Sequence, residues 1–237
     1  MNGRLMTGPK LRNLIMTFIA INLTNLLSMG FSWQDYWVDE RNIFPLIMGF
    51  FLWILVNYLL LKTALVDPGF IPRQPEDEHT EQFRHKFKNY IVLDGLAGQK
   101  THLINMKFCY TCTIIRPRRS VHCNVCDACV EMMDHHCPFV STCVGRRNYF
   151  AFTMFTWTLF VDCIFITWIT IHDIKRRSTA FQNSDEDGLQ EVVPRGQAIR
   201  NTFKEVPLSL AILLLCVVTI GGLCLLLSYH TKLSLFN

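Results

Sequence analysis

Four long apolar runs constrain this 237-residue chain more than any other feature. They cover residues 11–30, 43–66, 149–171 and 206–229, and a helix needs about 20 mainly apolar residues to cross a bilayer. The last run contains no charged residue at all. The sequence therefore predicts an α-helical integral membrane protein with four transmembrane helices.

The first run is less uniform than the other three. Asn13, Asn22 and Asn25 interrupt it, and basic residues precede it as they do in a signal peptide. No small-residue cleavage site follows the apolar stretch, so a retained anchor helix fits better than a cleaved leader.

Basic residues near the ends of the runs predict the orientation in the membrane. The start of the chain has three Lys and Arg residues and no acid, whereas residues 31–42 have one Arg and three acids. An inside N-terminus also puts residues 67–148, with eleven Lys and Arg against nine acids, in the cytosol. Lys175-Arg176-Arg177 argues the other way, because it would lie just outside the third span.

Three regions follow from this topology. Residues 1–66 hold two spans and a short luminal loop, residues 67–148 form a cytosolic Cys-rich domain, and residues 149–237 hold two spans, a polar luminal loop over 175–204 and a short tail. The net charge of +4 is too small to indicate a nucleic acid partner, so the bilayer is the expected partner.

The cysteines are concentrated in the predicted cytosolic domain. Of ten cysteines, Cys163, Cys216 and Cys224 fall inside spans, where a cysteine usually behaves as a small buried hydrophobe. The other seven lie between residues 109 and 143. Disulfides are rare in a reducing cytosol, so metal binding with one free thiol is the simplest interpretation of this odd number.

A duplicated spacing separates the metal ligands from the rest. The pattern Cys-x2-Cys-x9-His-x6-Cys occurs twice, with the second copy fourteen residues after the first. Each copy offers the Cys3His ligand set of a closed structural zinc site. Reduced cysteines without metal would leave this duplication unexplained. We expect two zinc ions, one held by Cys109, Cys112, His122 and Cys129, the other by Cys123, Cys126, His136 and Cys143.

The residues left over resemble a catalytic constellation. His135 and Cys137 belong to neither copy and lie within three residues after Asp134, in the manner of a nucleophile, its base and the group that orients the base. Zinc would hold His136 and so fix the backbone that presents both neighbours. Its four protein ligands leave no open position for Lewis-acid chemistry.

The position of Cys137 suits chemistry on a membrane-bound thioester. It lies twelve residues before the third span, so the thiol is tethered near the bilayer surface. A long acyl chain partitions into the bilayer by about 0.8 kcal/mol per methylene. Attack of a thiolate on a thioester changes the free energy little, which suits relay of the acyl group to a second thiol.

The sequence Asp134-His135-His136-Cys137 and the following CVGRRNYFAF resemble the DHHC family of membrane protein S-acyltransferases. The resemblance covers residues 107–152, and Asp67-Pro68-Gly69 and the four spans agree with it. It implies that palmitoyl-CoA acylates Cys137 and that Cys137 passes the acyl group to a cysteine of a protein substrate, in a ping-pong reaction. It also implies that His135 is the base, Asp134 its partner, and that the acyl chain lies between the spans.

The resemblance extends to partners and location. Family members act on membrane-associated proteins with cytosolic cysteines and are frequent in the Golgi and the endoplasmic reticulum, so these are the expected substrates and membranes. Members usually continue past the fourth span with a Thr-Thr-x-Glu motif, whereas this sequence ends at Asn237. A shortened chain, a divergent member and a chain completed by an accessory subunit all fit that ending.

The expected acyl-binding residues include one departure from the family. Phe139 stands where members commonly have Trp. Phe152, Phe155, Leu159 and Asp162 are spaced to share one face of a helix, although packing between helices would explain the aromatic residues equally well. An acid within a span costs about 3 kcal/mol on insertion scales, so we expect Asp162 at the closed end of the acyl cavity.

Two other functions compete with the acyltransferase. The first is a catalytically weak membrane scaffold that uses the zinc domain to bind client or accessory proteins. The second is a membrane-anchored zinc adaptor that resembles a ubiquitin-ligase finger, but it leaves the surplus Cys137 and His135 unexplained.

Overall fold

The computed structural model describes residues 8–32, 43–75, 107–182 and 194–236. The chain divides into two compact units, and each is described by itself. The first unit consists of Met1–Thr17 and Leu60–Phe152, and the second of Phe18–Leu59 and Thr153–Asn237.

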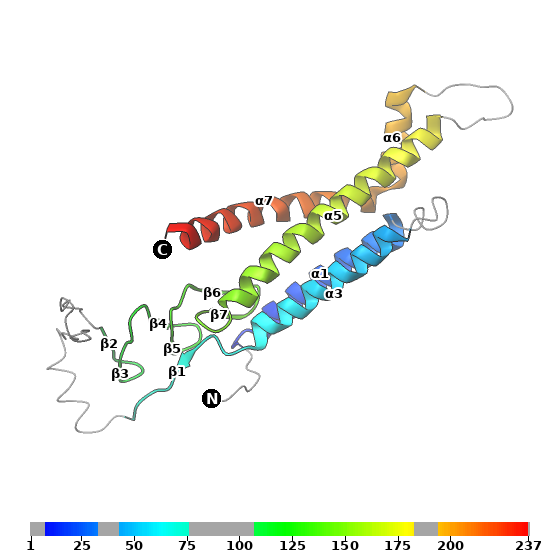
Figure 1. Cartoon of the computed structure of the whole chain (residues 1–237). Helices are drawn as coiled ribbons and strands as arrows, with labels where there is room; N and C mark the ends of the chain where they lie inside the picture. The colour runs from blue at the N-terminus through cyan, green and yellow to red at the C-terminus, as the bar shows by residue number, and fades with distance from the viewer. Residues whose placement is uncertain (1–7, 33–42, 76–106, 183–193, 237) are drawn as a thin grey trace. The chain divides into compact units, whose positions relative to one another are not determined.

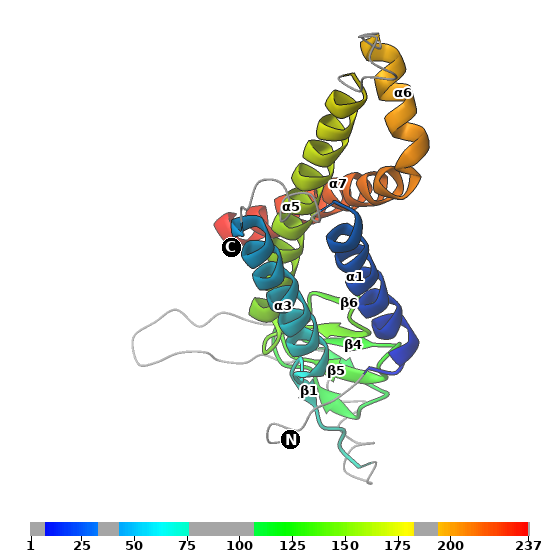
Figure 2. The same cartoon turned by 90° about the vertical axis from the view of Figure 1, so that its right-hand side faces the viewer.

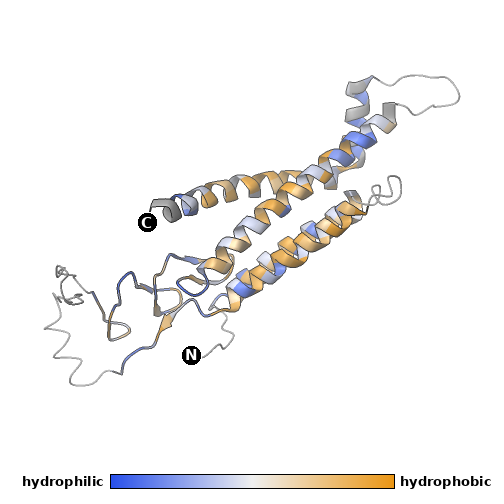
Figure 3. Ribbon diagram, in the orientation of Figure 1, coloured by the Kyte–Doolittle hydropathy of each residue, from blue (hydrophilic) through white to orange (hydrophobic). Residues whose placement is uncertain are grey.

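Four helices confirm the predicted spans (Figure 1). They are α1 (Leu11–Ser32), α3 (Phe44–Leu65), α5 (Tyr149–Gln182) and α7 (Pro207–Phe236). Each is long and apolar enough to cross a bilayer. Figure 3 shows hydrophobic residues along most of α7 and along much of the overlapping pair α1 and α3, as expected of helices whose solvent is lipid. The chain is a multi-pass membrane protein.

The sequence predicts a polar loop over residues 175–204, and this prediction is wrong for most of the described part of that range. Helix α5 continues to Gln182, and a further helix, α6 (Arg195–Glu205), precedes α7. Arg177 lies one turn after Asp173 and its Nε donates to Asp173 Oδ1 at 3.0 Å, an i,i+4 pair that favours the helix. Charged residues therefore extend α5 beyond its apolar run. The acidic stretch at 185–187 lies outside the described residues.

Polar side chains join the helices of the second unit. Asn22 of α1 accepts a hydrogen bond from Trp53 Nε1 of α3 at 2.9 Å and donates to Asn57 Oδ1 at 2.9 Å. Asn25 of α1 donates to Asp162 Oδ2 of α5 at 3.1 Å. Such bonds stabilise helix association in lipid, where a buried polar group has no water to bond.

The first unit contains short antiparallel strands instead of a large core (Figure 2). Three hairpins follow one another along the chain. The first joins β2 (Phe108–Cys109) to β3 (Ile114–Ile115), the second joins β4 (Val121–Cys123) to β5 (Ala128–Val130), and the third joins β6 (His135–Cys137) to β7 (Thr142–Val144). A short strand, β1 (Phe70–Ile71), pairs with β5 and completes a sheet of order β1-β5-β4.

Asp67 organises the chain after α3. Its Oδ1 accepts hydrogen bonds from the backbone N–H groups of Gly69 and Phe70, each at 2.9 Å. Its Oδ2 accepts from Arg147 at 2.7 Å. Gly69 has a φ of 108°, a conformation that L side chains rarely adopt. The Asp-Pro-Gly sequence thus forms the turn that leads into β1 and is bonded to the segment just before α5.

Asn148 makes a second connection within the same unit. It is fully buried, and its Nδ2 donates both to Thr63 O of α3 at 3.1 Å and to Cys143 O of β7 at 2.9 Å. Its Oδ1 accepts from the N–H of Gly145 at 2.9 Å. The end of α3, the third hairpin and the start of α5 are therefore held together.

Candidate metal centres and active site

Two clusters of cysteine and histidine lie in the hairpins. In each, the four candidate ligand atoms are all within 4.8 Å of one another. The clusters contain the same residues as the two copies of the sequence pattern: Cys109, Cys112, His122 and Cys129 in one, and Cys123, Cys126, His136 and Cys143 in the other.

Each cluster combines two successive hairpins. The first hairpin supplies its Cys-x2-Cys pair to the first cluster, and the second hairpin closes that cluster with His122 and Cys129, which face each other across the strands. The second hairpin also supplies a Cys-x2-Cys pair to the second cluster. The third hairpin closes it with the cross-strand pair His136 and Cys143. The repeat in the sequence is thus a repeat of hairpins, and the middle hairpin serves both clusters.

The distances within the clusters fit tetrahedral zinc. Zn–S bonds of about 2.3 Å and Zn–N bonds of about 2.0 Å at tetrahedral angles separate sulfur from nitrogen by about 3.5 Å. His122 Nδ1 lies 3.6 Å from Cys109 Sγ and 3.4 Å from Cys112 Sγ. His136 Nδ1 lies 3.3 Å from Cys126 Sγ and 3.6 Å from Cys143 Sγ. The donor set and its spacing are those of a structural zinc site.

The closely spaced thiols of the second cluster also favour the binding of a cation. The hydrogen bond from Cys143 lowers the pKa of the Cys126 thiol to about 6, although burial opposes this. That same bond and burial raise the pKa of Cys143. Two thiolates so close repel each other, so only one of the pair ionises easily without a positive charge. A bound divalent metal would let all three cysteines bind as thiolates.

Strand alternation separates the ligands from their neighbours in β6. Successive side chains of a strand point to opposite faces, so His136 points to one face while His135 and Cys137 share the other. His136 is directed to the second cluster, as its contacts with Cys126 and Cys143 show. The adjacent His135 and Cys137 are therefore presented together, away from that cluster.

The three residues outside the clusters are bonded to one another. His135 Nδ1 lies 2.7 Å from Asp134 Oδ2, which leaves Nε2 as the ring nitrogen available to Cys137. The hydrogen bond to Cys137 raises the pKa of the His135 imidazole, and the bond to Asp134 raises it further against the effect of burial. Cys137 itself is buried. The arrangement can hold a proton between a thiol and a carboxylate-oriented imidazole.

The turn formed by each Cys-x2-Cys pair, here called the knuckle turn, occurs a third time around Cys137. A further shift of fourteen residues carries the Cys-x2-Cys positions to Cys137 and Val140. The residue after each second position has a positive φ, namely 54° at Thr113, 50° at Asp127 and 57° at Ser141. Val140 is fully buried and offers no ligand. Cys137 thus has the position of a zinc-knuckle cysteine whose partner is a valine, a relation that the spacing already contained and that our reading of the sequence missed.

The four residues expected to bind the acyl chain have different surroundings. Phe139 is 67% exposed, whereas Phe152 and Phe155 are buried. The Phe152 ring meets the His135 ring edge-on, with centroids 5.3 Å apart. Asp162 is 1% exposed and bonded to Asn25, a partner that the sequence did not indicate. A groove elsewhere in the second unit is lined by none of these four residues.

The chain is similar to a known family of proteins. The family model described as DHHC palmitoyltransferase matches residues 102–237. Palmitoyltransferase ZDHHC9 of Danio rerio is 33% identical over 248 residues, which cover 100% of this chain and 59% of the relative. Palmitoyltransferase ZDHHC14 of Homo sapiens is 35% identical over 203 residues, 81% of this chain and 41% of the relative. The chain thus spans about half the length of the curated relatives it matches.

Proposed function

Because this chain belongs to the DHHC palmitoyltransferase family, we propose that it transfers a long-chain acyl group from palmitoyl-CoA or a similar acyl-CoA to cysteine thiols of proteins. Cys137 carries the acyl group between donor and acceptor. One observation carries the proposal: Cys137 belongs to neither Cys3His cluster, yet it bonds to a histidine that a carboxylate orients.

The first half-reaction loads Cys137. Its thiol gives a proton to His135 Nε2, and the sulfur attacks the carbonyl carbon of the acyl-CoA thioester. The bond between that carbon and the CoA sulfur breaks, and the CoA thiolate takes the proton back from His135. Asp134 holds the ring through Nδ1 and stabilises the imidazolium.

The second half-reaction transfers the acyl group from Cys137 to the protein substrate by the same route. The thiol of the protein substrate gives its proton to His135, and its sulfur attacks the acyl carbon on Cys137. The Cys137 sulfur leaves as a thiolate and recovers the proton. One thioester forms as another breaks in each step, so no external energy source is needed, and the kinetics are ping-pong.

The two clusters act as structural zinc sites in this proposal. Four protein ligands close each site, so the metal shapes the hairpins and takes no part in bond making. Through His136 it fixes the strand on which His135 and Cys137 lie side by side.

We further propose that the acyl chain lies along one face of α5. Phe152, which contacts the His135 ring, begins this face, and Phe155 continues it. Asp162, ten residues or about 15 Å beyond Phe152 along the helix, closes it together with Asn25. Phe139 lies at the entrance, where its exposed ring can cover the chain.

The orientation and location follow from the charge pattern and the family. We place the Cys-rich domain in the cytosol and the protein in Golgi or endoplasmic reticulum membranes. Its substrates are membrane-associated proteins with cytosolic cysteines. An accessory subunit is a further candidate partner.

Acylation of the purified chain tests the central proposal. After incubation with an alkyne-bearing palmitoyl-CoA, we expect an adduct that hydroxylamine removes, as a thioester requires. Cys137→Ser should abolish the adduct with the zinc content unchanged, and Cys224→Ser, which removes an exposed cysteine of α7, should keep it. An adduct that persists in Cys137→Ser would refute the nucleophile. No adduct on the unaltered chain would favour the scaffold.

A further inference from the structure

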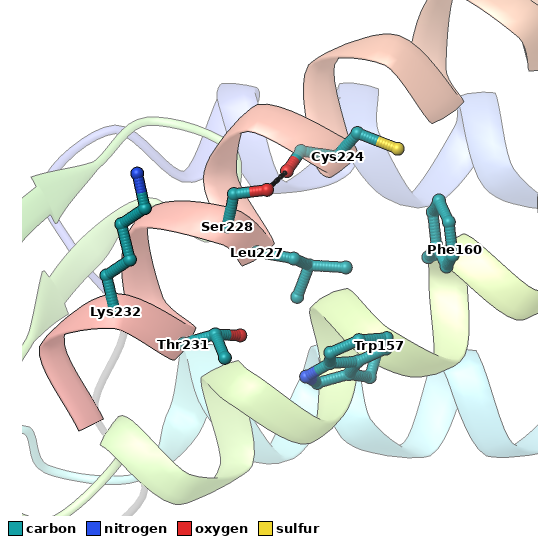
Figure 4. Close-up of a pocket in the computed structure, with 7 residues that line it drawn as sticks. All are labelled: Trp157, Phe160, Cys224, Leu227, Ser228, Thr231 and Lys232. Atoms are coloured by element: carbon teal, nitrogen blue, oxygen red, sulfur yellow. Dashed lines mark hydrogen bonds between the residues drawn. The ribbon is translucent and has the colours of Figure 1, made fainter. Parts of the chain in front are cut away.

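A groove between α5 and α7 lies apart from the proposed acyl-binding face. It has a volume of about 380 Å³ and is lined by Trp157 and Phe160 of α5 and by Cys224, Leu227, Ser228, Thr231 and Lys232 of α7 (Figure 4). Trp157 lies two residues after Phe155, and Phe160 two before Asp162. A step of two residues turns an α-helix by about 200°, so the groove and the acyl-binding face are on opposite sides of α5.

The groove forms where the two helices separate. Closer to the other end of α7, Ile212 and Cys216 pack against Cys163 and Ile166 of α5 and are buried. The same face of α7 continues in steps of three and four residues to Cys224, which is exposed. The packed interface therefore opens into a groove toward the last turns of α7, in a part of the helix that lies within a candidate span.

The lining of the groove changes from apolar to polar along its length. Phe160 lies at one end, and its ring meets the Trp157 ring edge-on, with centroids 6.1 Å apart; Leu227 forms a buried floor. Thr231 lies beside Trp157 and Lys232 lies at the other end, and both are exposed (Figure 4). Lys232 is the last residue of the candidate span. Within the described part of the chain it forms no ion pair.

We propose that this groove binds an anionic glycerophospholipid of the bilayer. One acyl chain lies along Trp157, Phe160 and Leu227, and the headgroup phosphate pairs with the Lys232 ammonium. The groove runs along helices that cross the membrane, so a lipid can enter it sideways with its chain already parallel to them. A cation at the end of a span, next to an apolar groove, complements the charge and shape of such a lipid. The proposal does not require acyl transfer.

Photolabelling of the 237-residue chain tests this site. The chain would carry Cys137→Ser, so that acylation cannot contribute, and would be placed in phosphatidylcholine nanodiscs with a small amount of diazirine-bearing phosphatidylserine. We expect mass spectrometry to find the label on the groove segments of α5 and α7. Unlabelled phosphatidylserine should compete for it, and added phosphatidylcholine should not.

Matched variants identify the groups responsible. Lys232→Gln should lower the labelling about fivefold, the effect of one basic residue near an anionic surface, and Trp157→Ala should lower it as well. Lys204→Gln, in the last turn of α6, and Trp168→Ala, an exposed aromatic of α5 outside the groove, should label like the parent. Unchanged zinc content and elution volume check that each variant is folded.

Three outcomes would overturn the proposal. The first is labelling spread evenly over the spans and insensitive to Lys232→Gln. The second is displacement of the label by palmitoyl-CoA and not by phosphatidylserine, which would assign the groove to the acyl donor. The third is a crosslink between two chains through the groove, which would assign it to a second copy of the protein.

Discussion

At the scale of the residue, one strand directs neighbouring side chains to two different places. His135, His136 and Cys137 form β6, and their alternation sends the middle residue to the metal cluster and the outer two to the opposite face. The sequence could predict this division because the spacing assigns His136 to the second copy of the pattern. It could not predict the contact of His135 with Phe152, which depends on where α5 begins.

His135 is expected to matter for chemistry and not for the fold. Glutamine is close to histidine in size and can still bond to Asp134, but it cannot accept the thiol proton. We expect His135→Gln to slow acylation of Cys137 by about 10²- to 10⁴-fold, the range for loss of a general base. The measurement is the single-turnover rate with palmitoyl-CoA. An equal rate, or loss of zinc together with activity, would contradict the assigned role.

The third knuckle turn leads to a prediction for Val140. This buried valine has the position that Cys112 and Cys126 hold in the first two turns. We expect Val140→Cys to bring a second thiol close to Cys137, so that mild oxidation joins them in a disulfide. Acylation should then fall by about tenfold or more, because the thiolate is the nucleophile, and a reductant should restore it.

Val140→Ala is the control for this variant, because it alters the same buried position without adding a thiol. It should respond to neither oxidant nor reductant beyond the response of the unaltered chain. If oxidised Val140→Cys acylates normally, the turn around Cys137 does not have the knuckle geometry that its φ angles indicate.

At the scale of the element, the metal clusters take the place of a hydrophobic core. Each hairpin is short, and a hairpin alone is marginally stable in water. The buried apolar residues packed with the clusters are few, such as Ile114 and Val130, and several cluster members are the cysteines themselves. Zinc binding is therefore expected to supply most of the free energy that folds this segment.

Loss of a ligand and loss of the nucleophile should thus differ. His136→Ala removes one of four ligands from the second cluster, and we expect the zinc content to fall from two ions to one per chain, with increased proteolysis of residues 107–148. Cys137→Ser should keep both ions and resist the protease like the unaltered chain. Both variants lose acylation, so metal analysis and proteolysis distinguish them. Two zinc ions in His136→Ala would remove that residue from the ligand set.

At the scale of the whole molecule, the sequence predicts the spans better than the contacts between them. Runs of apolar residues predict the number and order of the four membrane-spanning helices in the described part of the chain, because lipid imposes a minimum length. The extension of α5 to Gln182 was missed, since polar pairs such as Asp173 and Arg177 continue a helix that hydropathy ends. The bond of Asn25 to Asp162 joins residues 137 positions apart, and no local pattern reports such a pair.

The distant pair Asn25 and Asp162 is expected to limit the length of the acyl chain. In the proposed function, Asp162 and Asn25 close the acyl-binding face with polar groups, so a longer chain would press methylenes against them. Asp162→Leu replaces the carboxylate by an apolar side chain and removes the hydrogen bond. We expect the ratio of stearoyl to palmitoyl transfer to rise, by up to about fourfold for each methylene newly buried. Competing acyl-CoAs of different length, read by mass spectrometry of the Cys137 adduct, measure this ratio.

Asn57→Leu is the matched control, because it removes another intramembrane hydrogen bond, between Asn57 of α3 and Asn22 of α1, in which Asp162 takes no part. An unchanged ratio in Asp162→Leu, or an equal change in Asn57→Leu, would show that Asp162 does not select the length of the acyl chain.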